Sequence, residues 1–279
     1  MVTFSFPSEF FNIKDSLYCG QIFRFKPLNN GFLVFSLDKC AFCVTEGDLT
    51  NITCYKQDVD YFTNFFDLNT DYNYIYKKAL SFNIPILNRS AELGKGVRIF
   101  NQDPVETLFS FIISQNNNIP RISSCIEKLC ACFGEEREFL GEKYFSFPKV
   151  NSLANVSLDV FKSLGLGYRA QYVKKLADDI RAGFNVYALS SLDTNTLKLE
   201  LLSILGVGNK VCDCVLLFGF KRTDSFPVDT WIYKLYLENF SGTLTDRVKI
   251  ASFFVNLFGD YSGFIQQYLF YYKRSLENS

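Results

Sequence analysis

The chain has 279 residues, of which 48% are hydrophobic and 17% aromatic, so it can bury a large core in one large domain or two closely packed domains. Its 29 basic residues balance its 29 acidic residues, so any affinity for nucleic acid must come from local placement of positive charge. The absence of histidine excludes histidine triads, His-rich metal sites and histidine acid–base catalysis.

Cysteine usage and the N-terminus indicate the compartment. Nine cysteines without a secretory signal favour a reducing environment. The first residues, MVTFSFPSEFF, lack a basic segment followed by a long apolar one, and no uncharged apolar run approaches the roughly 18 residues of a membrane span. We therefore expect an intracellular protein that is neither secreted nor membrane-bound.

The first hundred residues predict a mainly β domain. Phe, Tyr, Val and Thr are frequent, and turn residues stand at Pro27, 29–31 and 46–48. Segments 31–37 and 40–45 are typical of short antiparallel strands, whereas segment 72–80 is typical of a helix.

From Gln102 onward the pattern becomes helical. Asp103, Pro104 and Glu106 have the order of an N-cap, a first-turn proline and a capping acid, and they precede an apolar run. After a polar interruption, helices are expected at residues 120–133, 157–164, 169–182, 195–204, 209–220, 230–239, 245–258 and 263–276. The predicted fold class is therefore α+β, with an antiparallel β-rich domain over residues 1–100 and an all-α domain over residues 101–279.

Two of these helices are joined by a short glycine turn, Gly206-Val207-Gly208, which predicts a helix-hairpin-helix. Glycine permits a positive φ and lets backbone approach a ligand closely. Amides after such a turn lie at a helix N-terminus and suit a DNA phosphate, so both glycines are candidate DNA-binding residues. A second Gly-x-Gly turn precedes Arg169, and with Lys174 and Lys175 beyond it we expect one shared DNA-facing surface.

Lys210 and Asp229 are the candidate catalytic residues. Lys210 lies in the first turn of the second hairpin helix, where the helix dipole and partial desolvation both favour the neutral, nucleophilic amine. Asp229 follows Pro227, where it can cap the next helix and face Lys210. This pair suits attack at a sugar C1′ through a cationic transition state. A phosphate-binding lysine and a plain N-cap aspartate are the alternative interpretation of the same spacing.

The stretch from Leu201 to Trp231 resembles the helix-hairpin-helix and Gly/Pro-Asp motif of base-excision DNA glycosylases. Within them it is most similar to the 8-oxoguanine DNA glycosylase/AP lyase family. Further blocks resemble that family in the same order: CGQIFRF at 19–25, GVR at 96–98, QDP at 102–104, FSFII at 109–113 with NNNI at 116–119, and GLGYRAQYV at 165–173.

The resemblance implies the reaction. Lys210 would attack C1′ of a nucleotide flipped out of duplex DNA and form a Schiff base with the deoxyribose, and Asp229 would stabilise the oxocarbenium-like charge. The enzyme would excise 8-oxoguanine, expected opposite cytosine, and then nick the strand by β-elimination. It would be a monomer, cytoplasmic and nucleoid-associated or nuclear.

The resemblance also implies the residues that hold the base. Gly20 matches the glycine whose carbonyl accepts the N7 hydrogen that 8-oxoguanine has and guanine lacks, so guanine would leave that carbonyl unpaired. Gln266 and Phe270, four residues apart on one helix face, match residues that bond the base edge and stack on its ring. Cys214, one turn after Lys210, would close the other side of the ring.

Four more residues match positions that contact the duplex. Asn116 and Tyr168 match residues that fill and wedge the gap left by the flipped base, whereas Arg121 and Arg169 match those that read the orphaned cytosine. Two positions depart from the family pattern. Trp231 stands where eukaryotic members carry a phosphate-binding histidine, and Pro120 stands where a small residue is usual.

No cofactor is expected. Related glycosylases hold an iron–sulfur cluster with four cysteines after the aspartate, but no cysteine follows Cys214 here. Cys40, Cys43 and Cys54 offer three thiolates and would need a fourth ligand to bind zinc, so no metal site is predicted. A structural cation at the hairpin carbonyls is compatible with the resemblance. The alternatives are a non-catalytic helix-hairpin-helix DNA-binding module and a glycosylase of the same fold for another damaged base.

Overall fold

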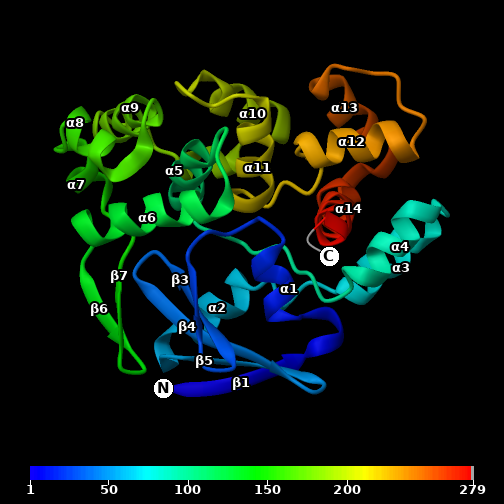
Figure 1. Ribbon diagram of the computed structural model, residues 1–279, viewed down its shortest axis with the longest axis horizontal. Helices are drawn as coiled ribbons and strands as arrows, with labels where there is room; N and C mark the ends of the chain where they lie inside the picture. Colours follow the sequence, from blue (N-terminus) through cyan, green and yellow to red (C-terminus); the bar gives the residue numbers. More distant parts are fainter. Residues whose placement is uncertain (278–279) are drawn as a thin grey trace.

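The computed structural model describes residues 1–277, and its N-terminal part contains a five-stranded antiparallel sheet (Figure 1). The strand order is β1-β5-β4-β3-β2. The α+β prediction is confirmed, and the two strands expected at 31–37 and 40–45 correspond to β3 and β4. The strands are β1 (Val2–Pro7), β2 (Phe25–Leu28), β3 (Gly31–Ser36), β4 (Lys39–Glu46) and β5 (Leu49–Cys54).

The sheet packs on both faces. One face meets α1 (Ile13–Tyr18) and α2 (Val59–Phe65) in a cluster of buried apolar side chains to which strand residues such as Val34 and Ile52 contribute. The other face meets a two-stranded hairpin, β6 (Glu136–Phe139) and β7 (Glu142–Phe145), through Leu33, Cys40, Phe139 and Tyr144. This hairpin comes from the helical part of the chain, and the sequence analysis missed it.

The second part of the molecule is helical (Figure 1). Its long helices are α5 (Pro104–Ser114), α6 (Ile119–Phe133), α9 (Arg169–Arg181), α10 (Thr194–Ser203), α11 (Asn209–Gly219), α12 (Thr230–Asn239), α13 (Arg247–Phe258) and α14 (Ser262–Glu277). Shorter turns of helix lie between them: α7 (Val150–Ala154), α8 (Leu158–Phe161), η3 (Lys162–Leu166), η4 (Tyr187–Ser191) and η5 (Gly259–Tyr261). Within residues 1–277 no helix has the length and apolar character needed to cross a membrane.

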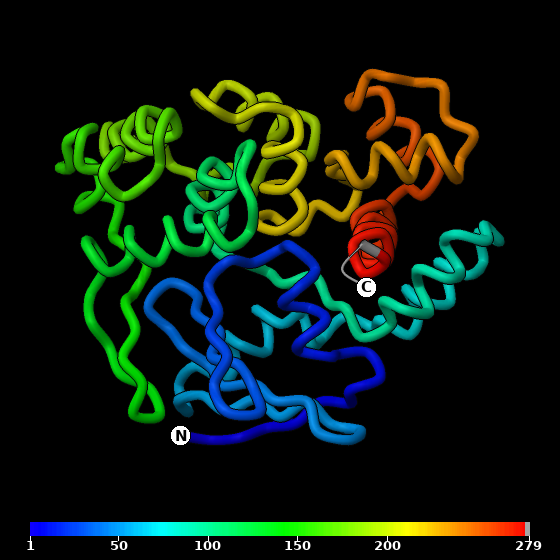
Figure 2. The backbone as a smooth tube through the Cα atoms, viewed as in Figure 1, coloured from blue at the N-terminus to red at the C-terminus, as the bar shows by residue number. Residues whose placement is uncertain are grey.

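Two helices that precede residue 100 pack into the helical part. Figure 2 shows the chain running from the sheet through α3 (Tyr72–Ser81) and α4 (Pro85–Leu93), beside α14, before it returns to α5. Buried residues of α3 and α4, among them Ile75 and Leu87, belong to the same core as α11 and α14. The short helices η1 (Ser8–Phe10) and η2 (Lys56–Asp58) stay with the sheet. The domain boundary at residue 100 stays a prediction.

The turn between β3 and β4 ties the sheet to the helices. Leu37 has φ +53°, a left-handed conformation that is unfavourable for leucine. Its N–H donates to Glu106 Oε2 (2.6 Å) and its carbonyl accepts from the N–H of Phe147 (2.7 Å). Glu106 also forms a buried ion pair with Arg24 (2.9 Å). Glu106, read from the sequence as a capping acid, therefore holds this turn and the arginine of the CGQIFRF block.

Arg98 holds the start of the helical part against the sheet domain. Its guanidinium is 1% exposed and lies over the rings of Tyr72 (4.1 Å) and Phe6 (4.7 Å). Nε donates to the Phe10 carbonyl (2.9 Å), and the terminal nitrogens donate to the carbonyls of Asp67 and Thr70. These carbonyls come from two separate segments, at Phe10 and at the turn of residues 67–70, so one side chain satisfies acceptors that no regular helix or strand would reach.

We predict that Arg98→Met destabilises the protein by about 3 kcal/mol, because buried carbonyls lose their donor. In a chain of this size this corresponds to a melting temperature lower by roughly 6–12 °C in a thermal unfolding experiment. Arg137→Met is the control, since Arg137 is 38% exposed and pairs with surface carboxylates and should cost at most about 1 kcal/mol. Equal losses from the two variants would contradict the role assigned to Arg98.

Candidate active site

The hairpin turn between α10 and α11 has the geometry that its two glycines require. Gly206 has φ +88°, and a Cβ there would lie 2.4 Å from Cγ of Tyr172. A larger residue would therefore be strained and would also clash with the ring. Gly208 is the N-cap of α11 and has φ −91°. The predicted helix-hairpin-helix is present, with Gly206 packed inside the turn and Gly208 at its surface.

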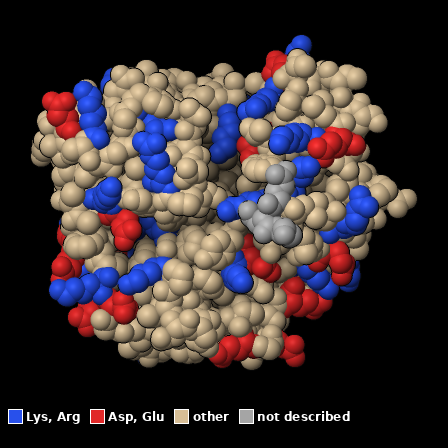
Figure 3. All heavy atoms as spheres, viewed as in Figure 1, with Lys and Arg blue, Asp and Glu red and all other residues tan. Residues whose placement is uncertain are grey.

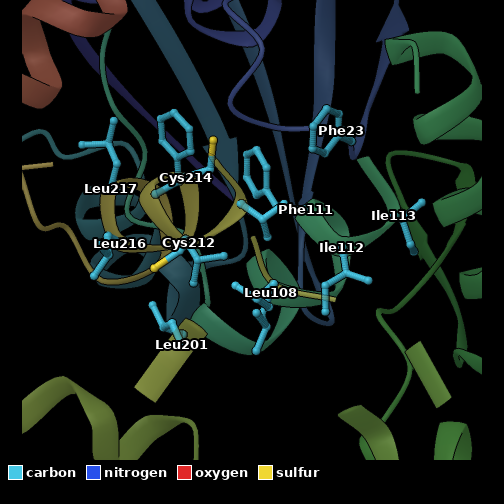
Figure 4. Close-up of a cluster of buried hydrophobic side chains, with 14 of the residues drawn as sticks. Phe23, Leu108, Phe111, Ile112, Ile113, Leu201, Cys212, Cys214, Leu216 and Leu217 are labelled. Carbon is cyan, nitrogen blue, oxygen red and sulfur yellow. The ribbon is translucent and has the colours of Figure 1, made fainter. Parts of the chain in front are cut away.

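Helix α11 is buried along most of its length. Residues 211–218 are all buried, and they pack on α5. Asp213, the charged residue within this run, forms an ion pair with Lys198 (2.7 Å). Figure 4 shows Phe111 of α5 lying between Cys214 of α11 and Phe23, which precedes β2. Because the rest of α11 is buried, the position of its first turn is fixed relative to the core.

Lys210 lies in that first turn and is half-buried. Its Nζ is 5.1 Å from the centroid of the Phe111 ring. Cys214 stands one turn further along, where burial raises the pKa of its thiol to about 11 although the charge of Lys210 lowers it. The amine is thus held between an aromatic ring and a neutral thiol, at the mouth of a pocket that it shares with Asp229.

Asp229 caps the next helix, as the sequence predicts. Its carboxylate accepts the N–H of Ile232 (2.9 Å) at the start of α12. Burial raises the pKa of this carboxyl above its ordinary value, and the hydrogen bond from Ile232 and the charges of Lys210 and Arg247 only partly offset that. Burial therefore disfavours the charged form of Asp229, whereas the neighbouring Lys210 amine favours it.

A small pocket lies beside these two residues. It has a volume of about 50 Å³ and is lined by Cys19, Gly20, Lys210, Cys214, Phe218, Pro227, Asp229, Gln266, Gln267 and Phe270. This is room for a few water molecules, so side chains must move before a nucleobase can enter. The amide of Gln266 donates to the Pro227 carbonyl (3.2 Å), and Gln267 donates to Gln266 (2.8 Å).

The pocket wall at Gly20 is held from behind by Gln21. The Gln21 side chain is 0% exposed, donates to the carbonyls of Ser16 (2.9 Å) and Arg98 (2.6 Å), and accepts the N–H of Phe100 (2.7 Å). Gly20 itself has φ +80°, and a Cβ there would lie 3.0 Å from the Phe270 ring. The glycine of the CGQIFRF block thus faces the pocket, and its glutamine fixes the loop.

A wider groove opens on the other side of Lys210. It has a volume of about 710 Å³ and is lined by Ser114, Gln115, Asn116, Asn117, Tyr168, Gly208, Asn209, Lys210, Val211, Asp229, Thr230, Trp231 and Arg247. Figure 3 shows a hollow between α11 and α12 with Lys and Arg side chains on both sides. The pocket and the groove share Lys210 and Asp229, so a ligand in the groove lies next to the pocket at this pair.

The residues expected to contact DNA do not all line this groove. Asn116, with φ +45°, and Tyr168, which is 48% exposed, do so. Arg169 is 4% exposed, and its guanidinium donates to the carbonyls of Gln115 and Asn116, so in this state it holds the asparagine turn. Arg121 is exposed, and its guanidinium reaches the Gly165 carbonyl (3.4 Å).

Two other expectations are clarified by the structure. Lys174 and Lys175 form ion pairs with Asp178 (2.6 Å) and Asp179, so their charge is neutralised locally and adds little to a DNA-facing surface. Pro120 lies in the first turn of α6, where Asn118 caps the helix, so the helix accommodates it without a kink.

The sequence analysis missed several pocket residues. Phe218 follows Lys210 and Cys214 at a spacing of four, so a helical projection could have placed it on their face. Cys19 and Gln267 are neighbours of residues that were identified. Phe111, whose ring lies beside Lys210 outside the pocket lining, gave no signal beyond an apolar helix. The structure also bears on metal binding. Within residues 1–277 no cluster of three or more His, Cys, Asp or Glu residues could hold an ion. Burial raises the pKa of the Cys40 and Cys43 thiols, which disfavours thiolates.

Family sequence profiles match two adjoining parts of the chain. Residues 3–108 match the 8-oxoguanine DNA glycosylase, N-terminal domain, and residues 109–246 match the HhH-GPD superfamily base excision DNA repair protein. The fold and the site therefore define the class of base-excision DNA repair proteins built on a helix-hairpin-helix.

Solved structures and curated relatives narrow the class. The Clostridium acetobutylicum 8-oxoguanine glycosylase/lyase, in complex with double-stranded DNA containing cytosine opposite 8-oxoG, is 37% identical, with a TM-score of 0.91 over 96% of this chain and 93% of that chain. MBOgg1, in complex with a low affinity DNA ligand, is 34% identical, with a TM-score of 0.94 over 99% of this chain and 97% of that chain.

The Methanothermobacter thermautotrophicus probable N-glycosylase/DNA lyase is 27% identical over 78% of this chain and 75% of its own length. The N-glycosylase/DNA lyase of Saccharomyces cerevisiae is 37% identical over 50% of this chain and 41% of its own length, so the match spans less than half of that relative. The chain belongs to the 8-oxoguanine DNA glycosylase family and is a DNA N-glycosylase with AP lyase activity.

The resemblance assigns Asp229 to stabilising positive charge on the sugar. We therefore predict that Asp229→Asn lowers the rate of base release by about 100-fold or more and does not lower stability at neutral pH. Asparagine can still accept the Ile232 N–H. The pKa of Asp229 is raised in the folded state, so its charge destabilises the wild type above that pKa and has no such effect below the unfolded value near 3.8.

The difference in melting temperature, variant minus wild type, should therefore be positive at pH 7 and shrink as the pH falls towards 4. Circular dichroism at several pH values measures it. The assigned environment of Asp229 would be contradicted by a variant that melts below the wild type at pH 7 and whose melting temperature rises relative to the wild type as the pH falls.

Proposed function

We propose that this enzyme excises 8-oxoguanine from duplex DNA with Lys210 as the nucleophile and then cleaves the strand at the resulting abasic site. The observation that carries the proposal is the position of Lys210 and Asp229, which stand together where a wide groove meets a pocket bounded by Gly20, Cys214 and Phe270. The groove accommodates the DNA strand, and the pocket receives one flipped base after its side chains have moved apart.

Lys210 acts through its neutral amine. The Nζ lone pair attacks C1′, the bond between C1′ and the base breaks, and the base leaves with that electron pair and takes up the proton released from the amine. The Asp229 carboxylate faces the positive charge that develops on the sugar and stabilises it. The nitrogen lone pair then forms the C1′=N bond while the C1′–O4′ bond breaks, and O4′ takes up a proton to become a hydroxyl. The product is a protonated Schiff base between Nζ and C1′.

Strand cleavage follows from the same intermediate. The Schiff base acidifies the hydrogens on C2′, one of which is removed as a proton, and the electron pair expels the 3′ phosphate in a β-elimination. Hydrolysis of the imine returns Lys210. Asp229 suits the proton transfers, because burial raises the pKa of its carboxyl and so makes protonation easier than for an exposed aspartate. No cofactor enters these steps.

Recognition of the base is assigned to the pocket walls. The Gly20 carbonyl accepts the N7 hydrogen of 8-oxoguanine, while guanine would place a lone pair against it, an unsatisfied contact. Cys214 and Phe270 cover the two faces of the ring, and the Gln266 amide bonds its edge. The neutral thiol of Cys214 suits this role, since it presents no charge to the ring.

The partner is double-stranded DNA, with cytosine opposite the lesion, as in the complex of the Clostridium acetobutylicum relative. Asn116 and Tyr168 fill the space that the flipped base leaves, and Gly206 and Gly208 present the hairpin amides to a phosphate. Arg121 and Arg169 read the orphaned cytosine after DNA has displaced their contacts to backbone carbonyls. We place the enzyme, as a monomer, in the compartment that holds the genome.

We predict that Lys210→Gln abolishes strand cleavage on a duplex with one 8-oxoguanine opposite cytosine, lowering the rate by about 1,000-fold or more, since the nucleophile is lost. Gel electrophoresis of an end-labelled strand measures cleavage, and chromatography measures the released base. Lys143→Gln is the control, because Lys143 is exposed on the β6–β7 hairpin, where it pairs with the exposed Glu136. Wild-type enzyme that cleaves an abasic duplex but leaves 8-oxoguanine intact would contradict the base assignment.

We predict that Gly20→Ala lowers excision of 8-oxoguanine by about 100-fold while lowering cleavage at a preformed abasic site by less than about tenfold, because only the base must enter the pocket. Single-turnover kinetics on the two duplexes measure this ratio. The control is Gly141→Ala, where φ is +78° and no atom lies within 4 Å of the added Cβ. It imposes similar backbone strain far from the pocket, so a matching effect there would overturn the explanation.

A further inference from the structure

We propose that Arg247 binds a phosphate next to the flipped nucleotide, an inference that rests on the proposed function. Arg247 begins α13 and lines the groove together with Lys210, Asp229 and Trp231. The guanidinium therefore stands on the side of the groove across which the strand must pass to bring its sugar to Lys210.

Charge in the groove is unevenly distributed. Among the described residues that line it, Lys210 and Arg247 are the two cations and Asp229 is the one acid. Lys210 is committed to C1′ in the proposed reaction and Asp229 would repel a phosphate. The sugar attacked at C1′ carries a phosphate on each side, so Arg247 is left as the groove's charged partner for this backbone.

The Arg247 side chain is available for this contact. Within residues 1–277 it forms no ion pair with a carboxylate, and it is exposed. Its guanidinium lies 5.7 Å from the centroid of the Tyr233 ring, which supports it from α12 without using its hydrogen-bond donors. Arginine in such a setting can bind a phosphate with two parallel N–H donors.

Two neighbouring features favour the side chain over the backbone as the ligand. The amide of Val248 at the start of α13 is already bonded to the Asp246 side chain (2.8 Å), so this helix end is capped by an acid. Trp231, at the groove edge, has a single N–H donor and no charge. Lys234 lies over the Trp231 ring (5.1 Å) and is not among the groove-lining residues.

The test compares Arg247→Gln with Lys249→Gln, which removes one positive charge from the same helix outside the groove lining. Affinity is measured by fluorescence anisotropy on a duplex carrying a tetrahydrofuran abasic analogue, which needs no base recognition. We expect Arg247→Gln to weaken binding about tenfold and to reduce the slope of log affinity against log salt by about one. Lys249→Gln should change the affinity by no more than about twofold and the slope by much less than one. Equal effects of the two variants would overturn the proposal.

A second series locates the phosphate. Each phosphate flanking the analogue is replaced in turn by a neutral methylphosphonate. One position should weaken wild-type binding about tenfold and leave Arg247→Gln unaffected, since the two changes remove the same contact. Losses that add in the variant at every position would overturn the proposal. Failure of the wild type to release 8-oxoguanine would instead contradict the proposed function, and the two failures are therefore distinguishable.

Discussion

A carboxylate and an amine are held together at two helix starts, where burial opposes the charge of the carboxylate. Asp229 stays in this position because its oxygen caps α12 and because Lys210 lies in the first turn of α11. Neither helix could present its residue at a fixed place unless it were anchored elsewhere. Burial of α11 from residue 211 to 218 supplies that anchor, and Phe111 of α5 lies beside the amine.

The pocket depends on both parts of the molecule. Gly20 comes from the loop between α1 and β2, Cys214 from α11, and Gln266 and Phe270 from α14. Small movements between the sheet and the helices would change the width of this pocket. Several contacts oppose such movement: Arg98 binds carbonyls of two segments, Glu106 holds Leu37 and Arg24, and Lys221 pairs with the buried Asp67. The width of the pocket therefore depends on contacts that lie far from it.

Regular, strongly patterned segments could be predicted from the sequence. Helices α9 to α14 lie within a few residues of their expected limits, and Asp103 and Asp229 cap the helices that follow them. The hairpin β6–β7 escaped because its strands have only four residues each, EREF and EKYF, and runs of charged residues in them mask any alternation of polar and apolar side chains. Strands β1, β2 and β5 were not assigned either. β1 pairs with β5, more than forty residues away, and no local pattern encodes that contact.

The residues of the candidate site were predictable from residue types and family blocks. The size of the pocket and the contacts that its residues make in this structure were not. Motifs placed Lys210, Asp229, Gly20, Cys214, Gln266 and Phe270 together, and all six line one pocket. No local signal indicates that this pocket holds only about 50 Å³, because its size depends on how α14 packs against the Gly20 loop. Arg169 is a similar case, since its contacts to the carbonyls of Gln115 and Asn116 join segments more than fifty residues apart.

The central claim is that the Lys210 amine bonds covalently to the sugar of the damaged nucleotide. Borohydride reduction during turnover on a duplex with 8-oxoguanine opposite cytosine, followed by digestion and mass spectrometry, tests it most directly. The account predicts one reduced adduct, with the deoxyribose joined to the peptide that contains Lys210. An adduct on another residue, or base release without any adduct, would contradict it.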